Sequence, residues 1–164
     1  MRRAPESRIR TVVVIASLAI GGPVHAQPTP QRGGELHVDA IAGRRGAIEA
    51  AAGVILPVGI YSRTAFVVAV GAASRESGSL IVGRGEFVSR FLLDPFRESP
   101  LGLSVGGGLG VTNLSDPNRW RPYLALLLDL EMRRRAGITP AIQLGLGGGT
   151  RLGLVLRTGT ERWR

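Results

Sequence analysis

The sequence predicts an all-β fold: an eight-stranded antiparallel up-and-down transmembrane β-barrel that follows a cleaved signal peptide. Two observations predict it. From residue 34 onward the chain divides into short runs in which apolar and polar residues alternate, and turn-forming residues separate the runs. Within these runs the charged residues share one face of the alternation, and the opposite face is apolar.

Residues 1–26 have the layout of a secretory signal peptide. A basic start, MRRAPESRIR, precedes the apolar stretch TVVVIASLAIGGPV. Small residues at Val24 and Ala26 then predict cleavage after Ala26. The alternative is an uncleaved anchor, but the apolar stretch is short for a membrane span and the letters GGP interrupt it.

The length of the remaining chain is enough for one domain. Cleavage leaves 138 of the 164 residues and lowers the net charge from +9 to +6, because four arginines and one glutamate are removed. Residues 27–33, QPTPQRG, are interpreted as a flexible leader and residues 34–164 as the barrel domain. The arginines do not gather into one patch, which argues against nucleic acid as a partner. There is no cysteine, so disulfides and thiolate metal sites are excluded.

The expected strands are bounded by turns rich in Gly, Pro, Asp, Asn and Ser, such as GRRG, SRESG and LSDPNRW. Because the links are short, each strand is expected to pair with its neighbours in sequence, which gives a meander. The strands are predicted at residues 35–42, 47–56, 61–73, 79–93, 101–112, 121–132, 141–148 and 151–157.

One segment also fits a helix. Residues 123–135 have high helix propensity, with Pro122 suited to a first helical position and Gly137 to a stop. Arg121, however, is a poor N-cap, and a helix would surround Asp129 with leucines. As a strand, the same segment places leucines on one face and acids on the other.

The charged face predicts a lumen held by ion pairs. Six acids and six arginines share it, and a closed interior of low dielectric requires such a balance because unpaired buried charge is costly. Gly and Ala make up much of the rest of this face, which leaves room for long side chains in a narrow barrel. The predicted network consists of Glu35, Asp39, Glu49, Arg63, Arg84, Glu86, Arg90, Arg121, Asp129, Glu131, Arg151 and Arg157.

The apolar face is expected to contact lipid, because strands of about ten residues match a tilted transmembrane strand. The alternative is a soluble periplasmic barrel in which the apolar face is the core and holds an apolar ligand. The residues expected to face lipid include Phe66, Val68, Phe87, Leu103, Leu124, Leu126, Leu128, Leu144 and Leu154.

In signal peptide, strand count and alternation, the chain resembles the small outer-membrane β-barrel proteins of Gram-negative bacteria. It is similar in particular to short eight-stranded members that carry a phrase like RFLLDPFRES, here residues 90–99. The resemblance implies an outer-membrane location, periplasmic termini, and outer-membrane lipid and the barrel assembly machinery as partners. Two features depart from the family: the links that would face outward are short, and the chain ends ERWR with Trp163 penultimate instead of a terminal aromatic residue.

These features predict a non-enzymatic role in the envelope, structural or adhesive, with no cofactor or metal and with no protein partner specified. An enzymatic alternative rests on GLSVG, residues 102–106, which matches the pattern of hydrolase nucleophiles. With His37 and Asp39, Ser104 would then serve a lipid-modifying hydrolase. The simpler interpretation makes Ser104 a small lumen residue and His37 a lumen histidine beside a carboxylate.

Overall fold

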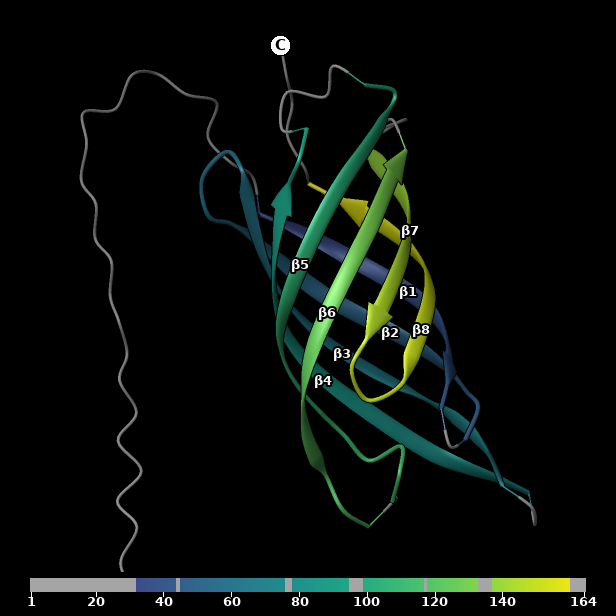
Figure 1. Cartoon of the computed structure of the whole chain (residues 1–164). Helices are drawn as coiled ribbons and strands as arrows, with labels where there is room; N and C mark the ends of the chain where they lie inside the picture. The colour runs from purple at the N-terminus through teal and green to yellow at the C-terminus, as the bar shows by residue number, and fades with distance from the viewer. Residues whose placement is uncertain are drawn as a thin grey trace, which may run out of the picture.

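A computed structural model of the chain describes residues 32–43, 45–75, 78–94, 99–116, 118–132 and 137–159. These residues form a closed barrel of eight antiparallel strands, in which each strand pairs with its sequence neighbours and β8 pairs back to β1 (Figure 1). The predicted fold class is therefore confirmed. The signal peptide with its cleavage after Ala26, most of the leader, and the end of the chain with Trp163 lie outside the described residues.

The strand bounds lie within two residues of the predicted ones, except in β7. The strands are β1 Gly33–Ala42, β2 Ala47–Pro57, β3 Ser62–Arg75, β4 Gly78–Leu92, β5 Leu101–Thr112, β6 Arg121–Met132, β7 Ile138–Leu146 and β8 Thr150–Thr158. The prediction placed β7 at 141–148, so the strand starts three residues earlier than predicted and ends two residues earlier. The turn instead takes Gly147, Gly148 and Gly149, whose φ angles of 120°, 69° and 145° suit glycine and end the strand early.

The helical alternative is wrong for the described part of residues 123–135, because β6 is a strand through Met132. Its alternation decides the matter: as a strand, β6 buries both acids and Leu127 and exposes its other four leucines, whereas a helix would mix acids with exposed leucines. Among the described residues, no helix is long and apolar enough to span a membrane.

The barrel has two distinct ends. Gly33 at the start of β1 and Thr158 at the end of β8 lie at one end, here called the terminal end. At the opposite end, here called the far end, the chain turns between β1 and β2, β3 and β4, β5 and β6, and β7 and β8 (lower end in Figure 1). The β3–β4 hairpin extends well past the last paired residues of β4 and β5, Arg84 and Thr112.

Large apolar side chains cover the outside of the barrel. Their exposed fractions among the predicted lipid-facing residues run from 38% at Leu103 to 73% at Leu124. The structure places all of these residues on the outer face: Phe66, Val68, Phe87, Leu103, Leu124, Leu126, Leu128, Leu144 and Leu154. Part of the interior is lined by a buried cluster of mostly small apolar residues from β2, β3, β4 and β6, among them Ala51, Ala65, Ala69, Val88 and Ala125.

Candidate functional site: the charged lumen

The structure buries most of the charged residues expected in the lumen. Eleven of the twelve are at most 7% exposed, the value for Arg63. They are Glu35, Asp39, Glu49, Arg63, Arg84, Glu86, Arg90, Asp129, Glu131, Arg151 and Arg157.

Arg121 is the exception, because its side chain is exposed. It is the first residue of β6, and β7 pairs with β6 only between Leu126 and Glu131. The wall that would enclose Arg121 therefore stops short of it. Arg121 is on the inward-facing side of β6, but it lies past the end of β7, where the barrel wall no longer encloses it.

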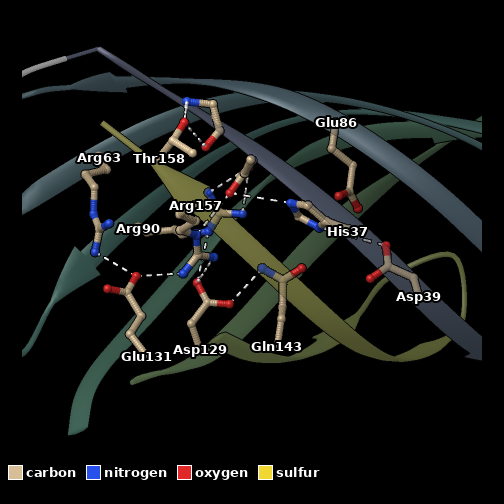
Figure 2. A network of polar contacts seen from close by, with 12 residues as sticks. His37, Asp39, Arg63, Glu86, Arg90, Asp129, Glu131, Gln143, Arg157 and Thr158 are labelled. Carbon is tan, nitrogen blue, oxygen red and sulfur yellow. Dashed lines mark hydrogen bonds and ion pairs between the residues drawn. The ribbon is translucent and has the colours of Figure 1, made fainter. Parts of the chain in front are cut away.

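One half of the network lies toward the terminal end and is centred on Arg157 (Figure 2). We call it the terminal cluster; its members are Glu35, Arg63, Arg90, Asp129, Glu131 and Arg157. Arg157 donates from Nε to Glu35 at 3.1 Å, from Nη1 to Glu131 at 2.6 Å and from Nη2 to Asp129 at 2.9 Å. One guanidinium on β8 thus joins β1 and β6 through charge-assisted hydrogen bonds.

Two further arginines complete the terminal cluster. Arg90 donates to Oε1 of Glu35 from both terminal nitrogens at 3.2 Å, and its Nε forms an ion pair with Asp129 at 3.0 Å. Arg63 donates to Glu131 at 2.8 Å. Three carboxylates therefore meet three arginines.

Polar neighbours satisfy the remaining positions around Asp129. Gln143 donates to its Oδ1 at 2.7 Å, and the Ser104 hydroxyl donates to its Oδ2 at 3.3 Å. Gln143 is uncharged and was not among the predicted lumen residues. It belongs to the alternate residues of β7 that face the lumen, and it is paired with Asp129 across β6 and β7. The alternation is the signal that identifies it.

The other half, toward the far end, is centred on Arg84. We call it the far cluster; its members are Asp39, Glu49, Arg84, Glu86 and Arg151. Arg84 donates to Glu49 at 2.7 Å, to Glu86 at 2.5 Å, and to Asp39. Arg151 donates to Glu86 at 2.8 Å. Three carboxylates here meet two arginines.

Tyr123 joins the far cluster, although it was not among the predicted lumen residues. Its hydroxyl donates to Oε1 of Glu86 at 2.6 Å. The ring lies beside the β7–β8 turn and β5: a Cβ added at Gly147 in the turn would be 2.8 Å from it, and one added at Gly110 on β5 would be 2.5 Å from it. Tyr123 belongs to the same alternate residues of β6 as Asp129 and Glu131, which face the lumen, and this alternation is the signal that identifies it.

His37 lies between the two clusters on β1. Its Nε2 is 3.5 Å from Glu35, and its Nδ1 is 4.0 Å from Asp39. The described contacts do not join it to Ser104, whose hydroxyl is directed at Asp129 instead. Ser104 is also buried within the continuous strand β5, whereas a nucleophile of the G-x-S-x-G type requires a sharp turn from strand to helix.

Glycines opposite the charged residues make room for them. A Cβ at Gly71 would lie 2.8 Å from Cγ of Glu49, and a Cβ at Gly145 would lie 2.9 Å from Nε of Arg151. The register places a glycine directly across from most members of the network. These pairs are Glu35–Gly53, Asp39–Gly153, Glu49–Gly71, Glu86–Gly110, Arg90–Gly106, Glu131–Gly102 and Arg151–Gly145.

The fold was compared with those of known proteins. No protein-family model matches the chain, and no curated protein matches it. Among solved structures, it is similar to the N-terminal β-barrel domain of Pseudomonas aeruginosa OprF, with a TM-score of 0.58 and 12% identity over 80% of this chain and 98% of that one. Neisserial surface protein A, NspA, matches with a TM-score of 0.53 and 10% identity over 79% and 96% of the two chains.

A designed protein is similar as well. A chain described as "De novo design of transmembrane beta-barrels" matches with a TM-score of 0.53 and 14% identity, over 80% of this chain and 97% of that one. At these identities the likeness concerns the fold alone. The fold is that of the small eight-stranded transmembrane barrels.

Proposed function

We propose that this chain is an outer-membrane β-barrel protein with a structural, non-enzymatic role in the bacterial envelope. One observation carries the proposal: the barrel is polar inside and apolar outside. Among the described residues, eleven Arg, Asp and Glu side chains are buried within it, while residues such as Leu124 and Leu154 are more than 60% exposed on its surface. In water this outer face would be a very large apolar patch, whereas lipid is its natural solvent.

The interior supports a structural role. Arg157 links β8 to β1 and β6, and Arg84 links β4 to β1 and β2. These bonds join neighbouring strands or cross the lumen, so the network holds the barrel wall together from within. A lumen filled in this way favours a rigid body in the membrane over a conducting pore. It also argues against the soluble alternative, because an apolar ligand requires an apolar interior.

A non-enzymatic role is favoured by the surroundings of Ser104. A nucleophilic serine needs a base within hydrogen-bond reach and access for its substrate. Ser104 is buried and donates to Asp129, whose other oxygen accepts from Gln143. This arrangement orients a carboxylate for Arg157 and Arg90. Outer-membrane lipid and the barrel assembly machinery are the partners that the proposal implies.

Expression of the full chain in a Gram-negative host tests the proposal. We expect recovery in the outer-membrane fraction and different mobility on SDS gels before and after boiling, because a closed barrel resists the detergent until heated. A soluble periplasmic marker protein serves as the control for fractionation. Recovery with that marker, together with identical mobility in boiled and unboiled samples, would disprove the outer-membrane role.

A further inference from the structure

The interior becomes apolar again beyond the far cluster. At this height the inward residues of β1 to β4 are not charged, and each is buried. They form a separate cluster with one residue of the β5–β6 turn, and its members are Ile41, Ala47, Ala73, Val82 and Leu114. A leucine in a polar turn is thus directed inward across the end of the lumen.

Leu114 is buried although it lies in a turn. It is 4% exposed, whereas the next residue, Ser115, is exposed. Turns usually lie on the protein surface, with their side chains in solvent, and are more mobile than the strands they connect. The burial of Leu114 therefore requires a local constraint.

Hydrogen bonds to β4 provide that constraint. Asn113 and Gly83 bond reciprocally: the Gly83 amide donates to the Asn113 side chain at 2.7 Å, and the Asn113 amide donates to the Gly83 carbonyl at 3.2 Å. The Thr112 hydroxyl also donates to the Gly83 carbonyl, at 3.1 Å, and accepts from the Leu114 amide at 3.1 Å. The segment is thereby attached to the tall β3–β4 hairpin.

Trp120 packs against the same point. A Cβ added at Gly83 would lie 3.0 Å from the Trp120 ring, so a larger residue there would have to displace the ring. Gly83 is thus the common anchor of Asn113, Thr112 and Trp120. The anchor lies one residue from Arg84, the centre of the far cluster.

We propose that residues 112–114 form a plug, in which Leu114 closes the far end of the lumen and keeps water from the far cluster. Ion pairs strengthen as water is excluded, and Arg84 and its three carboxylates lie directly beneath this apolar layer. The apolar contacts of Leu114 close the end of the lumen. The two hydrogen bonds between Asn113 and Gly83 keep Leu114 in this position.

Thiol labelling tests the plug, since the chain contains no cysteine. Two buried alanines serve as matched reporter positions: Ala69, opposite Arg84 in the far half, and Ala141, opposite Glu131 in the terminal half. Each is changed to Cys in the refolded full chain. The probe is a small trimethylammonium methanethiosulfonate, which reacts only where water reaches.

We expect Ala69→Cys to react slowly in the native background. Leu114→Ala or Asn113→Ala should raise its rate by at least about tenfold, because the rate follows the population in which the end is open. The rate at Ala141→Cys should stay within about twofold, since local opening at one end leaves the other end closed. Asn113→Ala keeps the leucine and provides the test if Leu114→Ala does not fold.

The control variant is Leu93→Ala, which removes an exposed turn leucine at the terminal end and should change neither rate. Folding of each variant is checked by its mobility on unboiled gels. The proposal is overturned if both plug variants fold and leave Ala69→Cys as slow as before. Fast labelling of Ala69→Cys in the native background, or equal acceleration at both reporters, would overturn it as well.

Discussion

The two halves of the lumen are built on one plan and differ in charge. In each, a central arginine bonds three carboxylates: Arg157 in the terminal cluster and Arg84 in the far cluster. The terminal cluster adds two more arginines, and the far cluster adds only Arg151. Among the described residues, the terminal cluster therefore has three arginines for three carboxylates, whereas the far cluster has two arginines for three carboxylates.

The difference is visible atom by atom. Both oxygens of Glu35 and both of Asp129 accept hydrogen bonds. In the far cluster, by contrast, one oxygen of Asp39 and one of Glu49 have no hydrogen-bond partner among the described residues. These two acids are directly opposite each other in the register of β1 and β2, where like charges repel. The terminal cluster has unpartnered atoms too, but among the described residues its charged groups leave arginine nitrogens without a hydrogen-bond partner, on Arg63 and Arg90, whereas the far cluster leaves two carboxylate oxygens.

Removal of the central arginine of the balanced half should have the largest effect. Arg157→Met leaves three buried carboxylates with two arginines, so we expect the free energy of unfolding to fall by about 3–5 kcal/mol. Urea unfolding in detergent or lipid measures it. Arg121→Met is the matched control: because Arg121 is exposed, its loss should change the free energy by less than about 0.5 kcal/mol. Equal losses in the two variants would contradict the network.

Neutralising one acid in each half compares the clusters directly. Asp129→Asn should cost about 3 kcal/mol, because it removes a partner that Arg157 and Arg90 share. Glu49→Gln should cost less than about 1 kcal/mol, because it also relieves the repulsion with Asp39. Unfolding of the two variants under identical conditions gives the difference. If Glu49→Gln is as destabilising as Asp129→Asn, the far cluster has no excess of negative charge.

The outer face should show the smallest effect. Leu126→Trp meets acyl chains that rearrange around the indole, so we expect the free energy of unfolding to change by less than about 1 kcal/mol, whereas overpacking a close-packed interior costs about 1–3 kcal/mol. With Trp120 and Trp163 changed to Phe, brominated lipid should quench the new indole strongly.

Ala125→Trp is the control for this variant, because Ala125 is the adjacent residue and is buried in the lumen. It should unfold the barrel or destabilise it markedly. A destabilised Leu126→Trp protein whose indole is not quenched would mean that the leucines face inward.

The alternation of residues was sufficient to predict the fold and the two faces of each strand. Side chains in a strand alternate with a period of two whatever the strand pairs with, so Asp129 and Leu126 could be assigned to opposite faces from local sequence alone. For the same reason Tyr123 and Gln143 could have been predicted to face the lumen, since both lie on the same side of their strands as the charged residues.

The tertiary structure decided which charges meet, because the register and the heights of the strands are set by pairing between distant segments. The sequence predicts six arginines and six acids in the lumen, but Arg121 lies beyond the end of β7 and is exposed, and the buried charges divide unevenly between two clusters. The burial of Leu114 likewise depends on Gly83, some thirty residues away in the chain. The face to which a strand residue points is a local property of the backbone, whereas its enclosure in the lumen depends on the whole closed barrel.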